Sequence, residues 1–448
     1  MRKVEDWSLG YAILQPLGKI IYRFSHRHFT VCGLENVPRN EPVMLAPNHQ
    51  NALLDSLAIV LSSIFQPVFL GRADIFKKKL AAKILSFFKI SPVYRIRDGK
   101  DSLDKNQDVF DTSVRILTNK KMLCIYPEAA HIGMKSMMPH KKAIPRIVFI
   151  AAEKSNYELD IKIVPVGINY SHYYNFRRNV TVRYGKPISS KAYYSILKEE
   201  GEAKAANVLR NDLFEAIREL VVHVEDKPAY ELYDLAFEMA KPMVYHEQGI
   251  KHSYKHFDEA EQLITAKIHS ALESKPDEKE QLVEKAKLYK KLKSQLGFSE
   301  AELQKGRVGF FESLKIFLIL LVLIPFGIYG AIANGWLYYL TRYPYRKKLK
   351  DKQFYSTFSF GLSFFLFPIW TIIHFFILLL LLKSWIFALL LVAFSYPSGI
   401  LAWELGQLVL RIYHRFGYNR LAKGGHKAFD QLLNLRSELI LFFHELFA

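Results

Sequence analysis

Three long apolar stretches occupy the C-terminal third of the chain, and each reaches the length of a membrane-spanning helix. They run over residues 314–340, 358–382 and 385–403. Pro325, Gly327 and Gly330 interrupt the first stretch near its centre and leave two halves of about ten residues, which are too short to cross a bilayer singly. We therefore expect a re-entrant hairpin over the first stretch and a helical hairpin over the other two.

Basic residues on both sides of the first stretch agree with this expectation. Lys305 and Arg307 precede it, and a basic cluster over residues 342–352 follows it. Loops rich in Lys and Arg stay on the cytoplasmic side, so the first stretch should return to the side from which it enters. Pro368 and Pro397 interrupt the later stretches, which leaves shallow in-plane insertion open as an alternative to spanning.

Charge and cysteine content indicate an anionic partner and a reducing compartment. The formal net charge is +19, and the basic residues flank apolar stretches, as expected beside anionic lipid. Zinc-finger spacing and an Arg-rich arm are absent from the sequence, so we expect a phospholipid membrane and no nucleic acid as partner. Cys32 and Cys124 lie in apolar, strand-like runs, where a thiol is usually a small core residue. The first ten residues carry acids and no apolar core of signal-peptide length, which predicts a cytoplasmic first domain.

The first half of the chain alternates strand-like and helical segments. This alternation predicts an α/β domain whose functional loops lie at strand ends. The expected strands are 29–32, 43–46, 68–70, 92–94, 122–126, 161–166 and 180–184.

Changes in composition divide the chain into five parts. The segment after Glu225 is charged and helical. Its sequence is compatible with a lid, a spacer or a partner-binding hairpin. The predicted parts are an amphipathic interfacial helix (1–28), an α/β domain (29–224), a charged helical module (225–312), membrane-inserted segments (313–405) and an amphipathic helical tail (406–448).

A histidine and a carboxylate follow the strand expected at 43–46. His49 and Asp55 pair as a general base and the group that orients it: the imidazole takes a proton from a hydroxyl, and the carboxylate fixes its tautomer. No Gly-x-Ser-x-Gly elbow or reactive-cysteine context precedes the pair, so the hydroxyl should belong to the substrate. The competing interpretation is that Asn48 and Asp55 simply cap a helix.

Four sequence blocks resemble the glycerophospholipid acyltransferase superfamily, in order and approximate spacing, over about residues 29–188. They are Asn48-His49 with Asp55; Ile90-Ser91-Pro92-Val93-Tyr94-Arg95; Ile125-Tyr126-Pro127-Glu128, trailed by Pro139-His140-Lys141-Lys142 in place of the family's Pro-Phe-Lys; and Ile163-Val164-Pro165-Val166. The resemblance implies an acyltransferase domain of α/β fold.

Finer features resemble the yeast-type glycerol-3-phosphate and dihydroxyacetone-phosphate acyltransferases. Five residues separate His49 from Asp55, where most of the superfamily has four. After Glu128 the family usually continues with Gly, a small hydroxyl residue and often Arg, whereas this chain has Ala129, Ala130 and His131. This departure affects the expected acceptor more than the reaction.

The resemblance assigns roles to the remaining polar residues. Arginine binds phosphate with bidentate geometry, so Arg95 is the leading anchor for a phosphomonoester acceptor, with Arg97 and Lys141 as secondary candidates. Glu128 would accept a hydrogen bond from a second acceptor hydroxyl, fix Arg95 or cap a helix. Arg177 lies far along the chain but is a further candidate for the same pocket.

The expected function is that of an integral membrane O-acyltransferase of phospholipid biosynthesis, with its catalytic domain on the cytoplasmic face. It would transfer a fatty acyl group from acyl-CoA or acyl carrier protein to glycerol 3-phosphate or 1-acylglycerol 3-phosphate. We expect no metal and no further cofactor, because the histidines lack a ligand pattern with Cys or Glu. The alternatives are an acyltransferase for another lyso-lipid, such as an aminolipid, and a non-catalytic membrane scaffold.

Overall fold

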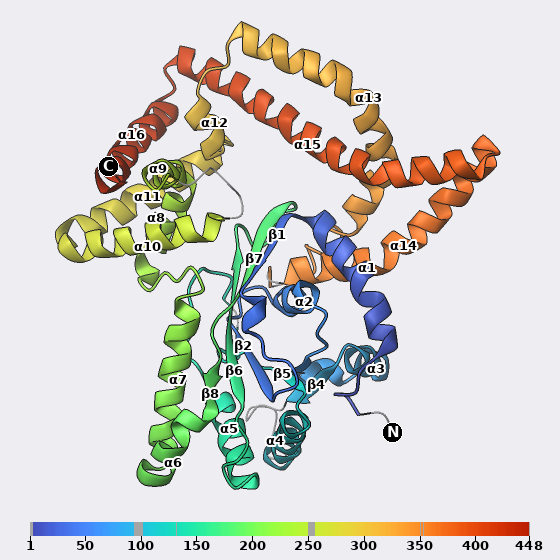
Figure 1. Ribbon diagram of the computed structural model, residues 1–448. Helices are drawn as coiled ribbons and strands as arrows, with labels where there is room; N and C mark the ends of the chain where they lie inside the picture. Colours follow the sequence, from blue (N-terminus) through green and yellow to red (C-terminus); the bar gives the residue numbers. More distant parts are fainter. Residues whose placement is uncertain are drawn as a thin grey trace. The chain divides into compact units, whose positions relative to one another are not determined.

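The structure is a computed structural model that describes residues 3–93, 102–130, 132–249, 256–349, 351–352 and 354–447. The chain forms two compact units, Met1–Glu225 and Asp226–Ala448 (Figure 1). The expected Arg95 and Arg97, and also His131, lie outside the described residues.

A mixed sheet forms the centre of the first unit, and it has eight strands among the described residues. The order is β1-β7-β6-β2-β5-β3-β4, with β8 beside β6. Neighbours pair in parallel except that β6 runs antiparallel to β7 and β8. The strands are β1 (His26–Cys32), β2 (Val43–Pro47), β3 (Val68–Arg72), β4 (Ile90–Val93), β5 (Met122–Cys124), β6 (Lys162–Tyr170), β7 (Arg178–Tyr184) and β8 (Ile188–Ser189).

The expected α/β fold class is confirmed, since each strand-like run of the sequence corresponds to one of β1 to β7. Their continuous apolar character reflects burial on both faces. All five residues of β2 are buried, and eight of the nine residues of β6 are buried. Parallel β2 and β5 end at the same edge of the sheet, where the loops that follow them meet.

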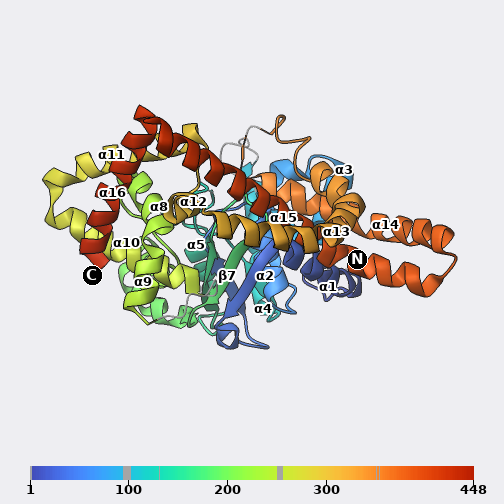
Figure 2. The same cartoon turned by 90° about the horizontal axis from the view of Figure 1, so that it is seen from above.

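Helices cover the sheet of the first unit (Figures 1 and 2). Met44 and Ala46 of β2 point into a core shared with α4, α5 and α7, while the alternate Leu45 points to the other face. The helices are α1 (Leu9–Ser25), α2 (Leu53–Ser62), α3 (Lys79–Phe87), α4 (Ser102–Thr118), α5 (Ala143–Lys154), α6 (Tyr194–Glu200) and α7 (Glu202–Arg218), with short 3-10 turns η1 (Leu34–Asn36), η2 (Ala73–Phe76) and η4 (Ser190–Tyr193).

The N-terminal helix α1 is amphipathic and belongs to the first unit. It buries Tyr11, Ile21 and Tyr22 and leaves Ile13 and Ile20 exposed. The helix ends at Ser25 and β1 begins at His26, so the expected boundary at residue 28 falls inside a strand.

Charged helices begin the second unit, and the C-terminal helix packs among them. A salt bridge of 2.7 Å joins Lys285 to Glu438, and Arg436 Nε donates to Glu300 Oε1 at 2.8 Å. The tail is therefore part of the charged module rather than a separate element. The helices are α8 (Tyr230–Met239), α9 (Lys241–Glu247), α10 (Phe257–Ser274), α11 (Pro276–Leu296), α12 (Glu300–Lys305) and α16 (Lys427–Phe447), with the 3-10 turn η5 (Lys227–Ala229).

Among the described residues, three helices are long and apolar enough to cross a membrane: α13 (Phe310–Leu340), α14 (Phe354–Leu382) and α15 (Trp385–Gly424). The expected re-entrant hairpin over 314–340 is absent, because α13 is one continuous helix with Pro325 inside it. The helix instead bends sharply (Figure 1), as helices commonly do at proline. Helices α14 and α15 form a hairpin, and α15 continues through the expected boundary at residue 405.

Candidate active site

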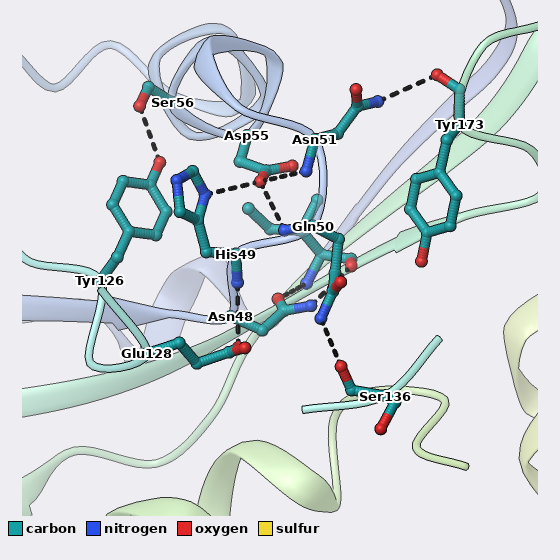
Figure 3. Close-up of polar contacts among 11 residues, drawn as sticks. Asn48, His49, Gln50, Asn51, Asp55, Ser56, Tyr126, Glu128, Ser136 and Tyr173 are labelled. Carbon is teal, nitrogen blue, oxygen red and sulfur yellow. Dashed lines mark hydrogen bonds and ion pairs between the residues drawn. The ribbon is translucent and has the colours of Figure 1, made fainter. Parts of the chain in front are cut away.

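The site forms where β2 ends and α2 begins (Figure 3). His49 lies two residues beyond β2, and its Nδ1 is 2.9 Å from Oδ2 of Asp55 in the first turn of α2. An ionised carboxylate has no proton to donate, so Nδ1 is the donor of this hydrogen bond, which in a neutral imidazole leaves the lone pair on Nε2. The Asp55 side chain is fully buried, whereas that of His49 is 16% exposed. Solvent can therefore reach the imidazole but not the carboxylate.

Backbone groups hold the Asp55 carboxylate in place. Its Oδ2 also accepts hydrogen bonds of 2.8 Å from the backbone N–H groups of Gln50 and Asn51. The carboxylate thus caps the turn before α2 and binds the His49 ring at the same time. Pairing with His49 and helix capping, the two competing interpretations of Asp55, therefore both hold. Burial, with a smaller contribution from the Asp55 charge, raises the pKa of the nearby Tyr170 hydroxyl, so that this group stays protonated.

The five-residue spacing between His49 and Asp55 forms a tight turn. Leu54 N–H donates to the Asn51 carbonyl at 3.0 Å, and Ala52 has φ 48° and ψ −131°. These angles match the first central position of a type II′ turn, which favours glycine. The turn that connects His49 to Asp55 therefore has a strained backbone at Ala52.

An aromatic ring supports the imidazole. Tyr126, which follows β5, stacks on His49 with 4.1 Å between ring centroids and an interplanar angle of 26°. Its hydroxyl lies 2.7 Å from Oγ of Ser56 in α2. Burial raises the pKa of Tyr126 well above its usual value, so the hydroxyl is neutral beside the dyad. The sequence motif contains Tyr126 but does not reveal this contact, because stacking depends on how two strand ends meet.

Glu128 connects the two loops of the site. Its Oε1 accepts from the backbone N–H of His49 at 3.1 Å, and its Oε2 accepts from that of Met138 at 2.9 Å. The side chain is fully buried. Both oxygens therefore bind backbone, which favours a positioning role over the predicted contact with an acceptor hydroxyl.

The amides beside His49 fix the same loop, and sequence reasoning missed their roles. Asn48 exchanges two hydrogen bonds with Ile168 of β6, donating to its carbonyl at 3.1 Å and accepting from its N–H at 2.7 Å. Gln50 Nε2 donates to the Ser136 carbonyl at 2.8 Å, and Asn51 Nδ2 donates to the Tyr173 carbonyl at 3.1 Å. Their signal in the sequence was an unbroken polar run after a buried strand.

Residues 28–169 match a family model described as Acyltransferase. This part of the chain is an acyltransferase domain. It includes the dyad, Tyr126 and Glu128, and this match, together with the yeast relative described next, confirms the resemblance to the glycerophospholipid acyltransferase superfamily.

Two proteins with stated activities are similar to this chain. Glycerol-3-phosphate O-acyltransferase 2 of Saccharomyces cerevisiae is 20% identical over 162 residues, which are 36% of this chain and 21% of the yeast protein. The chain thus spans about a fifth of the length of that curated relative. The crystal structure of the 1-acyl-sn-glycerophosphate (LPA) acyltransferase PlsC of Thermotoga maritima matches 46% of this chain and 78% of its own, with 16% identity and a TM-score of 0.31.

Ala129 stands where the family usually has Gly, and its backbone adopts a conformation that favours glycine. Ala129 has φ 56°, the left-handed region that glycine adopts without strain. Its N–H donates to the Tyr126 carbonyl at 3.2 Å. Alanine therefore occupies a turn position here that glycine would adopt with less strain.

Of the four basic residues predicted to bind substrate, the structure describes two. Arg95 and Arg97 lie outside the described residues. Lys141 is exposed, and its backbone N–H donates to the Pro127 carbonyl at 2.7 Å, so it lies on the Glu128 loop. Arg177 donates its N–H to the Ser25 carbonyl at 2.9 Å, at the junction of α1 and β1. The roles of these four residues in binding substrate stay predictions.

Within the described part of the chain, no group of three or more His, Cys, Asp or Glu side chains is placed to hold a metal ion. The expectation that the protein needs no metal and no further cofactor stays a prediction.

Proposed function

We propose that the protein is a membrane-bound O-acyltransferase that transfers a fatty acyl group from a thioester to a glycerol-phosphate acceptor in phospholipid biosynthesis. The observation that carries the proposal is the His49–Asp55 pair at 2.9 Å inside an acyltransferase domain. The imidazole presents Nε2 as a base, and the site has no nucleophile of its own in the motif. Direct transfer to a substrate hydroxyl fits this arrangement.

The proposed reaction has two steps. His49 Nε2 takes the proton of the acceptor hydroxyl as its oxygen attacks the thioester carbonyl, which forms a tetrahedral intermediate. The carbon–sulfur bond then breaks, the ester carbonyl re-forms, and the imidazolium returns the proton to the departing thiolate. Asp55 stabilises the imidazolium between the steps. Tyr126 limits rotation of the ring, and Glu128 fixes the backbone that bears it.

For the acceptor we propose glycerol 3-phosphate or 1-acylglycerol 3-phosphate. Both have a hydroxyl for the base and a phosphate that a guanidinium binds in bidentate geometry, which is the role proposed for Arg95. The yeast relative is a glycerol-3-phosphate O-acyltransferase by name, which supports this acceptor class. Lys141, on the loop of Glu128, would add positive charge. The donor would be acyl-CoA or acyl carrier protein, and no metal or further cofactor is needed for the steps above.

The proposed location is a membrane, with the acyltransferase domain on the cytoplasmic face. Helices α13, α14 and α15 have the length and apolar character of membrane helices. The formal charge of +19 favours the anionic surface of a cytoplasmic leaflet. Long-chain donors and lipid products partition into the bilayer, so an active site at the interface meets both.

The test uses purified full-length protein with acyl-CoA and, separately, each of the two acceptors. Release of the thiol and formation of lipid product are followed for the wild type and for His49→Ala. We expect product from at least one acceptor and its loss in the variant. Thiol release without any lipid product, or no reaction of the folded wild-type protein with either acceptor, contradicts the proposed acceptor class.

A second acceptor class is favoured by one observation. Ala129 and Ala130 replace the Gly and the hydroxyl residue that usually follow Glu128. Fewer polar groups then remain for a glycerol-phosphate headgroup, which suits another lyso-lipid such as an aminolipid. Full activity of Arg95→Ala would favour this class, because it would show that Arg95 does not bind an acceptor phosphate. Unchanged function after His49→Ala would instead favour a non-catalytic scaffold.

A further inference from the structure

Helix α3 of the first unit exposes a row of large apolar side chains. Leu80, Ile84 and Phe87 recur at helical spacing, and Leu80 is 71% exposed. None of the α3 residues whose side chains the structure describes is buried. A helix of a soluble domain normally turns such a row toward its core. The exposed row of α3 therefore indicates a partner other than the domain's own core.

Lysines surround this row. Lys77, Lys78 and Lys79 precede it or open the helix, Lys83 lies within it, and all four side chains are exposed. Between residues 71 and 93 the sequence has a single acid, Asp74, which is already paired with Arg72. An apolar row with a basic border is typical of helices that lie in the headgroup region of an anionic bilayer.

Helix α3 touches the N-terminal end of α1, which lies beside it in Figure 1. A Cβ placed on Gly10 would lie 3.1 Å from the Phe87 ring, so the two helices touch there. Ile13, one turn further along α1, is 64% exposed, and Trp7 just before the helix is 60% exposed. Trp is favoured at membrane interfaces because its ring is both apolar and polar. We define the docking face as Trp7, Ile13, Leu80, Ile84 and Phe87 with the lysines 77–79 and 83.

We propose that the docking face binds the surface of a bilayer that contains anionic phospholipids. The contact would hold the acyltransferase domain at the interface through its own surface, in addition to the attachment proposed for α13 to α15. Charge complementarity selects lipid over a second copy of this chain, because two faces bordered by lysines repel each other. The inference rests on the proposed membrane location but not on acyl transfer.

The test is the depth of a fluorescent probe on α3 in full-length protein reconstituted into vesicles. Cys32 is replaced by Ser; Cys124 can remain, because it is fully buried and burial raises the pKa of its thiol, which keeps it unreactive. An Ile84→Cys variant is labelled with a nitrobenzoxadiazole dye. Vesicles contain phosphatidylcholine with or without phosphatidylglycerol, and a fraction of the lipid has brominated chains that quench the dye on contact.

A matched control carries the same dye at Lys204→Cys. Lys204 is exposed on α7, which packs beside β6 rather than at the β4 edge where α3 lies. We expect quenching by brominated lipid at position 84, stronger with phosphatidylglycerol and weakened by salt, and none at position 204. Changing Lys77, Lys78 and Lys79 together to Gln should remove the extra quenching that phosphatidylglycerol causes.

Three results would overturn the proposal. Equal quenching at positions 84 and 204 would show that the face does not meet lipid. A blue-shifted dye without quenching would show that protein covers it. Quenching at position 84 that changes neither with phosphatidylglycerol nor with the lysine substitutions would show that the docking face does not recognise anionic lipid. Because the dye reports contact and not turnover, absence of acyl transfer would refute the proposed function and leave this result standing.

Discussion

At the scale of single residues, His49 depends on neighbours that bind its backbone as well as its ring. Asp55 fixes the ring through Nδ1, Tyr126 covers one face of it, and Glu128 accepts the His49 N–H. The dyad could be predicted from the sequence because a histidine and a carboxylate at this spacing have a known joint chemistry. The contacts that support His49 could not be predicted in the same way. They join loops that are far apart in the sequence, and the order of strands in the sheet brings these loops together.

Glu128→Gln should weaken both the fold and the reaction. The two backbone N–H groups that bind the carboxylate would face one carbonyl and one NH₂ group, which leaves a buried donor without an acceptor, at a cost of about 1–3 kcal/mol. Thermal unfolding in detergent measures the loss. Glu153→Gln, at an exposed position of α5, serves as control. In the reaction, kcat should fall more than KM rises; a rise in KM alone would instead indicate that Glu128 contacts the acceptor.

His140 should make the protein less stable in acid. Burial, the largest cause, lowers its pKa from 6.5 to about 4. Between pH 6.5 and about pH 4, His140 therefore carries a proton in the unfolded chain but not in the folded chain. The neutral side chain contributes stability that is fully present above pH 6.5 and is lost as the pH falls to about 4, by about 3 kcal/mol.

The variant His140→Phe isolates this effect, and Phe is the residue that the family usually has here. The difference in melting temperature between variant and wild type should grow in favour of the variant from pH 7 to pH 4. His444→Gln, at an exposed position, should not change the slope. A constant difference across this range would rule out His140 as the source.

At the scale of elements, short apolar runs predict the strands correctly, whereas proline and glycine in the long apolar stretches lead to a wrong prediction. The strand-like runs were recognisable because buried strands are short and continuously apolar. Pro325, Gly327 and Gly330 predict a break, yet α13 continues through them. The glycines serve packing instead: a Cβ on Gly330 would lie 2.1 Å from the Ser398 carbonyl carbon of α15. Small residues allow such close approach of membrane helices.

Gly330→Ala should therefore disrupt the packing of α13 against α15, with a cost of about 1–3 kcal/mol for overpacking. Gly335→Ala is the matched control, since a Cβ there would meet no atom within 4 Å. We expect a lower melting temperature in detergent for the first variant only. Equal melting temperatures would show that the two helices do not approach as closely as described.

At the scale of the whole chain, contacts within the second unit restrict how its helices enter a membrane. Helices α12 and α16 lie on either side of the apolar helices in sequence, yet Arg436 binds Glu300, and His414 of α15 lies 3.1 Å from Glu302. Segments in contact occupy the same side of a bilayer. The number of complete crossings between them is then even, so α13, α14 and α15 cannot each cross once.

Cysteine labelling measures this topology. Lys305→Cys and Lys427→Cys place thiols at exposed positions before α13 and after α15. In sealed proteoliposomes, a membrane-impermeant maleimide should react with both or with neither in each orientation of the protein. A third variant, Ser384→Cys at the tip of the α14–α15 hairpin, should react from the opposite side if that hairpin spans. Opposite sidedness of positions 305 and 427 would contradict the account.

The central claim is that His49 is the base of an acyl transfer. Its most direct test is the rate at which full-length protein in proteoliposomes transfers a labelled acyl group from acyl-CoA to glycerol 3-phosphate or 1-acylglycerol 3-phosphate. The account predicts that His49→Ala lowers this rate by about 10² to 10⁴, the usual contribution of a general base, while the melting temperature is preserved. An equal rate for the variant and the wild type would contradict it.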